Sequence, residues 1–177
     1  MNIQEKFYRE FIMMLNKHDV QFILVGGFAV AFHGYARYTN DIDIWVNPTE
    51  KNMKNVISAI SDFGYDTSIF NNHIFSDNDS PIKLHDGPLK IDVIHHLTKV
   101  ISFEEAFEKS KKIGYDEFYF NLLDYYHLEQ IKLAAGRQQD LLDVSKLRET
   151  RELLTGKKEP SLFWPRLKSL LKSIFKK

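Results

Sequence analysis

Residues 24–44 read LVGGFAVAFHGYARYTNDIDI, and both ends of this stretch have a clear structural meaning. The first end continues the apolar run QFILV of residues 21–25, which is typical of a buried strand that enters a tight turn at the two glycines. The other end, DIDI at residues 41–44, alternates polar with apolar side chains, as a strand with one buried face does. Because side chains alternate along a strand, the two aspartates are expected on one face, about 6–7 Å apart.

The two aspartates, Asp41 and Asp43, are candidate ligands of a metal ion. Carboxylates this close repel each other unless a cation lies between them. Mg²⁺ suits them because it prefers hard oxygen ligands and usually keeps water and phosphate oxygens in its other positions. The turn at Gly26 and Gly27 complements this pair, since backbone N–H groups without nearby Cβ atoms can approach a phosphate at the start of a helix. Tight packing or a solvated strand edge also explains each feature alone, but together they favour a site for Mg²⁺ and phosphate.

A third acid, Asp92, lies in the middle of the expected strand LKIDVI, residues 89–94. An unpaired carboxylate in such apolar surroundings is costly, so Asp92 needs a cation or a hydrogen-bond donor. Two explanations stay open. Asp92 is a further metal ligand, or it forms a surface ion pair with Lys90, which shares its face of the strand.

The remaining pattern predicts an α+β fold, a mixed β-sheet with flanking helices followed by a C-terminal helical subdomain. The expected helices are residues 3–17, 28–32 ending at Gly34, 49–63 with Thr49 as the cap, 102–111 opened by Ser102 and Glu105, and 122–154 with a break near Gly136. The expected strands are residues 21–25, 41–46, a hairpin of 82–85 and 89–94, and 115–120, while residues 66–81 are expected as irregular loop or a weak strand. We expect three parts, a core of residues 1–120, a helical subdomain of residues 121–156 and a tail of residues 157–177.

The composition of the chain excludes several classes of site. It has 177 residues and no cysteine, which rules out disulfides, thiolate metal sites, iron–sulfur clusters and cysteine nucleophiles. Its histidines do not show the spacing of a metal motif such as His-Glu-x-x-His, and no phosphate loop of the Gly-x-x-x-x-Gly-Lys-Ser/Thr type is present. No apolar run approaches the roughly 18 residues of a membrane span. The charged N-terminus has a helical pattern rather than that of a signal peptide, so we expect a cytoplasmic protein.

The formal net charge is zero, but the charge is unevenly distributed. Residues 157–177 contain seven basic residues and one acidic residue, so they carry +6 and the preceding 156 residues carry −6. An acidic body is a poor general binder of nucleic acid but suits a site that concentrates divalent cations. The tail has apolar residues on one helical stripe and lysines opposite. It is either a terminal helix packed on the body or a segment that binds a membrane surface or a partner.

Four basic residues in or near these motifs have either a structural role or a role in binding a nucleotide. His33 and Arg37 lie between the glycine turn and the aspartate pair, where they have a packing role or reach a bound nucleotide. Lys132 and Arg137 lie on or beside an expected helix, where basic side chains usually form a solvated face.

The motifs together resemble the nucleotidyltransferase superfamily, which has the DNA polymerase β-like fold. The resemblance lies in the Gly-Gly turn, the 13 residues that follow it, the pair Asp41-Ile-Asp43 and the later acid Asp92. Further on, EQIKLAAGRQQDLLD at residues 129–143 is similar to the Lys–Arg–Asp–Asp segment of minimal bacterial nucleotidyltransferases, including the AbiEii-like toxin group. Lys90-Ile-Asp92 resembles the Lys-x-Asp motif of the same group. The match covers roughly residues 20–145.

The resemblance implies a role for each matching residue. Asp41, Asp43 and Asp92 would be the catalytic residues and would bind two Mg²⁺ ions about 3.5–4 Å apart. Asp92 would bind the second metal or act as base on the incoming hydroxyl. Nucleotide binding falls to the glycines and the basic residues: Gly26, Gly27, Lys90, Lys132 and Arg137. The chain departs from the pattern at Phe28, where many relatives have serine, and at Gln138-Gln139, where relatives often have a basic residue.

The implied reaction transfers NMP from an NTP to a hydroxyl acceptor. That acceptor is an RNA such as a tRNA 3′ end, a protein side chain or a small molecule, and in a toxin–antitoxin pair the enzyme would also have a cognate protein partner. The alternative is a catalytically inactive nucleotide-binding or regulatory module on the same fold.

Overall fold

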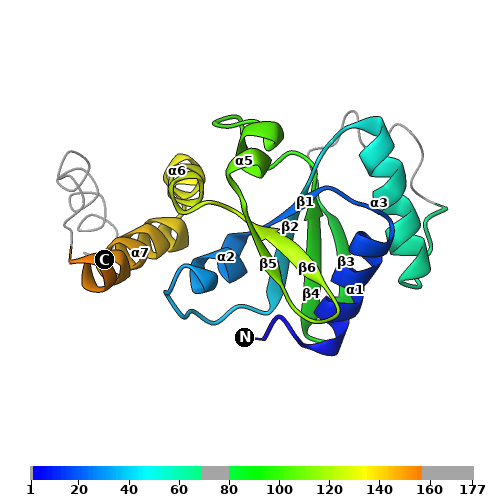
Figure 1. The fold of residues 1–177 in the computed structure, drawn as a ribbon, viewed down its shortest axis with the longest axis horizontal. Helices are drawn as coiled ribbons and strands as arrows, with labels where there is room; N and C mark the ends of the chain where they lie inside the picture. The colour runs from blue at the N-terminus through cyan, green and yellow to red at the C-terminus, as the bar shows by residue number, and fades with distance from the viewer. Residues whose placement is uncertain (1, 69–79, 157–177) are drawn as a thin grey trace.

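The computed structural model describes residues 2–68 and 80–156, which form an α+β fold around a mixed sheet (Figure 1). The six strands lie in the order β3-β4-β2-β1-β6-β5. They are β1 (Phe22–Val25), β2 (Asp41–Val46), β3 (Ile82–Asp86), β4 (Leu89–Ile94), β5 (Lys111–Gly114) and β6 (Tyr119–Leu122). The helices are α1 (Lys6–Lys17), α2 (Gly26–Phe32), α3 (Glu50–Asp62), α5 (Phe103–Lys109), α6 (Tyr125–Ala135) and α7 (Gln138–Thr155).

The centre of the sheet combines both strand directions. Strand β2 pairs antiparallel with β1 and parallel with β4, while β1 pairs parallel with β6. Each edge is an antiparallel hairpin, β3–β4 on one side and β5–β6 on the other. The central strands are apolar on the face that lies against the core, where Ile42, Ile44 and Leu24 have no exposed surface. This is why the alternating pattern of residues 41–46 identifies β2.

The helices gather in two groups toward opposite ends of the strands. Helices α1 and α3 pack side by side in one group, where Tyr8 of α1 is edge-on to Phe28 of α2, and α6 and α7 form the other group (Figure 1). On α1, Phe7, Phe11 and Leu15 recur every four residues and are buried, so this helix turns one apolar stripe to the core. Burial of each such side chain contributes about 1.5–3 kcal/mol.

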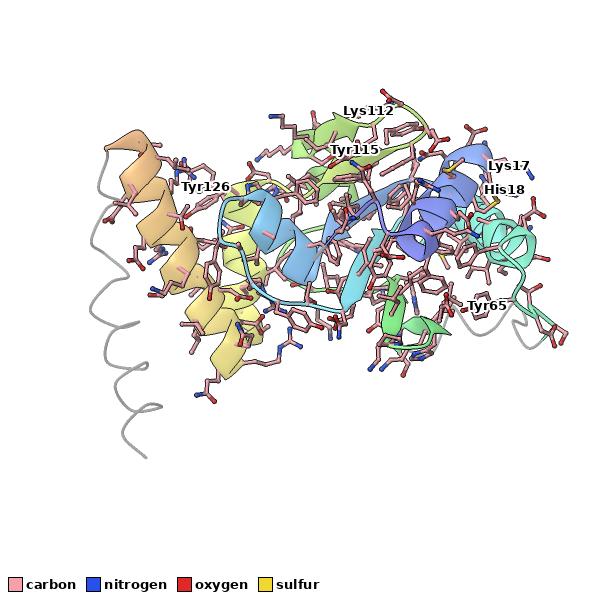
Figure 2. The ribbon with its side chains drawn as sticks, turned by 90° about the horizontal axis from the view of Figure 1, so that it is seen from below. Lys17, His18, Tyr65, Lys112, Tyr115 and Tyr126 are labelled. Carbon is pink, nitrogen blue, oxygen red and sulfur yellow. The ribbon has the colours of Figure 1, made fainter. Side chains whose placement is uncertain are left out.

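The long axis of the molecule separates the two groups. Figure 2 shows Lys17 and His18 at the end of α1 and Tyr126 of α6 at the opposite end of the molecule. Helices α6 and α7 form an antiparallel pair, here called the α6–α7 hairpin, which a buried ion pair between Glu129 and Arg148 holds together. Gly136 ends α6 in the left-handed conformation with φ +64°, which confirms the break expected there.

One sequence-based expectation about residues 102–120 is confirmed and one is wrong. The expected helix is present as α5, although it ends at Lys109, two residues before the expected end near residue 111, whereas a β5–β6 hairpin replaces the single strand expected over residues 115–120. The Tyr115 N–H donates to the Phe118 carbonyl at 2.8 Å and closes the turn between the strands. Strand β5 is an edge strand with Lys111 and Lys112 exposed, so it lacks the apolar alternation that would have revealed it.

Of the two expected helix caps, Ser102 forms its capping hydrogen bond and Thr49 does not. Ser102 Oγ accepts from the Glu105 N–H at 3.1 Å and caps α5 as expected. Thr49 stands at the start of α3, but its side chain makes no capping hydrogen bond. Instead the Thr49 N–H donates to Asn47 Oδ1 at 3.1 Å.

The C-terminal tail of residues 157–177 and most of the expected loop of residues 66–81 lie outside the described residues. Within residues 2–68 and 80–156, none of the helices has both the length and the apolar character needed to span a bilayer.

Candidate active site

Asp43 and Asp92 are direct neighbours in the sheet. Strands β2 and β4 run parallel, and their register pairs the Asp43 Cα with the Asp92 Cα. Neighbouring strands lie about 4.7–4.9 Å apart, and paired residues turn their side chains to the same face. Asp41 lies on this face too, two residues earlier and opposite Lys90. The sheet therefore brings Asp43 and Asp92, 49 positions apart in the sequence, to the same face of two neighbouring strands.

The electrostatic consequence falls on Asp43. Burial raises the pKa of its carboxyl to about 6, and the negative charges of Asp41 and Asp92 act in the same direction. The backbone N–H of Gly27 and the positive charge of Lys132 oppose the rise in pKa. At neutral pH the ionised carboxylate is thus held at a cost that a bound cation would relieve.

The glycine turn at the start of α2 is shaped by these side chains. Gly26 has φ +62°, and a Cβ placed on it would overlap Oδ2 of Asp43. A Cβ on Gly27 would lie 2.9 Å from Arg37 Nη2 and 3.1 Å from the Thr39 Cβ. Both glycines therefore serve close packing, but the groups that they pack against belong to the acidic site. The tight-packing explanation of this motif is confirmed, and its role in phosphate binding stays a prediction.

Asp41 is held by a neighbour that sequence reasoning did not single out. Thr39 is buried and its Oγ1 donates to Asp41 Oδ1. Within the described residues, no group of three or more His, Cys, Asp or Glu side chains is arranged to hold a metal ion. The Asp43–Asp92 pair alone still fits Mg²⁺, because this ion commonly takes one or two protein carboxylates and completes its shell with water and phosphate oxygens.

A cavity of about 470 Å³ opens in front of this pair. Its charged lining residues come from opposite elements, with Asp43 and Asp92 on the sheet and Lys132, Arg137 and Asp140 on the α6–α7 hairpin. Its remaining lining is glycine or apolar: Val25, Gly26, Pro81, Ile94, Leu97, Leu123, Leu128, Ile131 and Ala135. An acidic wall thus faces a basic one, with apolar surface between them.

The basic wall is a network of ion pairs in which Lys132 and Asp140 are buried and the Arg137 side chain is exposed. Lys132 is 6% exposed, and its Nζ donates to Asp140 Oδ1 at 3.0 Å and to Asp143 Oδ2 at 2.8 Å. Arg137 Nε donates to Asp140 Oδ2 at 2.6 Å. Burial alone would raise the pKa of Asp140, but the hydrogen bonds from Arg137 and Lys132 outweigh it and lower the pKa. The hydrogen bond to Asp140 likewise raises the pKa of Arg137, so the Arg137–Asp140 pair is charged at neutral pH.

The remaining residues of interest lie away from the cavity. Lys90 is exposed, does not line the cavity and forms no ion pair with Asp92 within the described residues. Phe28 is buried in the core, edge-on to Tyr8 with ring centroids 5.5 Å apart, so no hydroxyl group could replace its ring without loss of packing. His33 Nε2 is 2.7 Å from the carbonyl of Leu123, which is a packing role. Gln139 Nε2 donates to Asp143 at 2.9 Å.

Solved structures resemble this chain, whereas no family model and no curated protein matches it. TM1012 of Thermotoga maritima, described as a candidate nucleotidyltransferase, superposes with a TM-score of 0.53 over 84% of this chain and 91% of its own, at 16% identity. The antibiotic-resistance factor ANT(2″)-Ia superposes with a TM-score of 0.55 over 97% of this chain and 90% of its own, at 10% identity.

The chain has a nucleotidyltransferase fold. Identities this low carry the likeness of fold alone, so the chemistry of the site has to be argued from its own residues.

Proposed function

We propose that the protein is a Mg²⁺-dependent nucleotidyltransferase that moves NMP from an NTP to a hydroxyl acceptor. One observation supports this most strongly. Asp43 and Asp92 are paired in register across β2 and β4 and face Lys132 and Arg137 across one cavity. A magnesium nucleotide has the matching charges, since its metal needs carboxylates and its phosphates need cations.

Each residue has a place in this scheme. Asp43 and Asp92, with Asp41 beside them, would hold Mg²⁺, which when bound stabilises the charge on the entering and leaving oxygens. Lys132 and Arg137 would bind the phosphate oxygens from the opposite wall, and Gly26 would let the chain of phosphates pass close to the backbone. The apolar lining between the walls suits the sugar and the base.

The reaction itself balances without any further reagent. The acceptor oxygen attacks the α-phosphorus and forms a P–O bond, while the bond from this phosphorus to the bridging oxygen of the β-phosphate breaks and pyrophosphate leaves. The proton of the acceptor hydroxyl passes to Asp92 or to water. Catalysis of this kind depends mainly on positioning and on electrostatic stabilisation.

The acceptor belongs to the proposal as a class only. A hydroxyl of an RNA end, of a protein side chain or of a small molecule satisfies the same chemistry, and a role in a toxin–antitoxin pair with a cognate partner would follow from the first two. Incubation of total tRNA, protein and metabolites with each NTP and Mg²⁺, followed by mass spectrometry, would identify the acceptor by its added mass.

The proposal is tested by transfer of label from an α-³²P-labelled NTP. We expect Mg²⁺-dependent labelling of an acceptor, at least a hundredfold less in Asp43→Asn, and no change in Asp116→Asn, whose exposed carboxylate lies in the β5–β6 turn. Transfer that survives Asp43→Asn removes the proposed mechanism. Calorimetry that finds Mg²⁺-nucleotide binding, with no transfer to any acceptor, would instead identify the inactive nucleotide-binding module.

A further inference from the structure

Asp143 joins two basic side chains from distant parts of the chain. It is fully buried on α7, and its Oδ2 accepts from Lys132 Nζ at 2.8 Å and from Arg37 Nη1 at 2.9 Å. Lys132 belongs to α6, whereas Arg37 belongs to the segment of residues 33–40 that leads from α2 to β2. One carboxylate therefore ties the α6–α7 hairpin to the segment that leads to the acidic strand.

Arg37 extends this connection to the glycine turn. Its Nη2 and Nε lie 2.9 Å and 3.1 Å from the position that a Cβ of Gly27 would take, so the guanidinium lies directly on the first turn of α2. Its Nε is buried and has no hydrogen-bond acceptor within the part of the chain that the structure describes. Among those same residues, the ion pair with Asp143 is the one that neutralises this guanidinium.

Thr39 completes the connection to the acids. Its Cβ lies beside Gly27 on the same side as Arg37, and its hydroxyl donates to the carboxylate of Asp41. A continuous series of contacts thus runs from Asp143 through Arg37, Gly27 and Thr39 to Asp41. The same Asp143 oxygen also sets the place of Lys132, whose charge acts on Asp43.

We propose that Asp143 is a positioning residue of the candidate active site. Its carboxylate fixes Lys132 on the basic wall and, through Arg37, holds residues 33–40 so that the glycine turn and Asp41 keep their geometry. Buried ion pairs contribute little net stability compared with apolar packing, so two of them on one oxygen are better explained by the geometry that they impose. The catalytic part of this inference depends on the proposed function, but the structural part does not.

The test compares Asp143→Asn with a matched control, Glu129→Gln. Glu129 is also buried and ion-paired with Arg148 between α6 and α7, but it does not line the cavity. Two quantities are measured in the full chain, amide hydrogen exchange in residues 33–40 and the dissociation constant for Mg²⁺-ATP. We expect Asp143→Asn to raise the exchange rate and the dissociation constant at least tenfold. We expect Glu129→Gln to leave both quantities within about twofold, even if the melting temperature falls equally in the two variants.

Arg37→Gln is a second test of whether the contact between Arg37 and Asp143 holds residues 33–40. The Arg37 side chain is partly exposed, and the variant leaves Asp143 and Lys132 paired. We expect it to loosen residues 33–40 as Asp143→Asn does. In the double variant the exchange of residues 33–40 should be no faster than in the worse single variant, since both changes break the same contact.

Three results would overturn the inference: equal exchange in Asp143→Asn and Glu129→Gln, multiplied effects on exchange in the double variant, or unchanged exchange in Arg37→Gln. If the unmodified protein binds no magnesium nucleotide, the proposed function fails, and the exchange measurement still decides whether Asp143 positions residues 33–40.

Discussion

The carboxylate of Asp43 lies against the backbone of Gly26, so closely that a Cβ at position 26 would overlap Oδ2. The glycine that starts α2 and the acid of β2 are therefore one structural unit, although 16 residues separate them in the sequence. Val25 pairs with Asp43 in the antiparallel β1–β2 ladder, and this register brings the turn and the carboxylate together.

Gly26→Ala should consequently damage the site as well as the fold. A non-glycine residue at φ +62° costs about 1–2 kcal/mol, and the new methyl group must also displace Asp43. The matched control is Gly87→Ala, because Gly87 has φ +56° and open space where the Cβ would lie. We expect Gly87→Ala to lose about 1–2 kcal/mol of unfolding free energy, and Gly26→Ala to lose more because Asp43 must also move. Metal-dependent nucleotide binding should fall only in Gly26→Ala, and an equal loss in the control would contradict the account.

The stability of the metal-free protein should depend on pH through Asp43. Its pKa is about 6 in the folded protein, against an ordinary value of 3.8 for an aspartate in water, so the folded state binds this proton more tightly. Stability from this group is therefore present below about pH 4 and is lost as the pH rises through 6, by about 3 kcal/mol. Urea unfolding at pH 4 to 8 measures it. Asp43→Asn should remove this part of the slope, and Asp116→Asn should keep it.

The stabilisation that Mg²⁺ binding gives through Asp43 should increase with pH, opposite to the dependence in the metal-free protein. An ion that binds the ionised carboxylates stabilises the folded state more at pH 8 than at pH 5, because it competes with the proton for Asp43. The melting temperature should rise with Mg²⁺ at pH 8 in the unmodified protein and stay constant in Asp43→Asn. A rise of equal size in both proteins would place the ion elsewhere.

Lys132→Met should destabilise the protein strongly. The ammonium group is buried between Asp140 and Asp143, and its removal leaves two buried carboxylates with less positive charge around them. Breaking a buried pair in this way costs about 3–5 kcal/mol. The double variant Lys132→Met/Asp140→Asn should recover part of this free energy without recovering nucleotide binding. If the second substitution destabilises further, the interpretation of Lys132 as the cation that holds both acids is wrong.

Phe28→Ser should not raise the proposed nucleotidyl transfer, although many members of the superfamily that the sequence resembles have serine there. Phe28 is 1% exposed and packs against Tyr8, so the substitution creates a cavity and buries a hydroxyl group. We expect a loss of about 3–5 kcal/mol in chemical denaturation and no gain in label transfer. Higher transfer activity in Phe28→Ser would show that the hydroxyl group reaches the phosphate after all.

The predictable parts of the fold are those with a local pattern. The alternation of polar and apolar residues predicts strand β2, and the Asp86-Gly87 turn between two apolar runs predicts the β3–β4 hairpin. Strand β5 could not be found in this way, because Lys111 and Lys112 are exposed on an edge that buries little apolar surface. The end of α5 could not be placed for the same reason.

Only the part of the candidate site that forms a local motif could be predicted from the sequence. Asp41 and Asp43 form a local motif, but the pairing of Asp43 with Asp92 depends on strand register, which the sequence does not display. The contact of Arg37 with Asp143 joins residues 106 positions apart and had no local signal beyond the 3-residue spacing of Asp140 and Asp143 on one helix face. Thr39 was missed because its role appears only once the conformation of residues 33–40 is known.

The central claim, that Asp43 and Asp92 together hold a divalent metal with a nucleotide, is tested most directly by metal binding itself. Mn²⁺ can replace Mg²⁺ at oxygen sites, and its electron paramagnetic resonance signal reports the free ion. With a nonhydrolysable ATP analogue present, we predict tight Mn²⁺ uptake by the unmodified protein and by Asp116→Asn, and at least tenfold weaker uptake by Asp43→Asn and by Asp92→Asn. Equal uptake by all four proteins would contradict the claim.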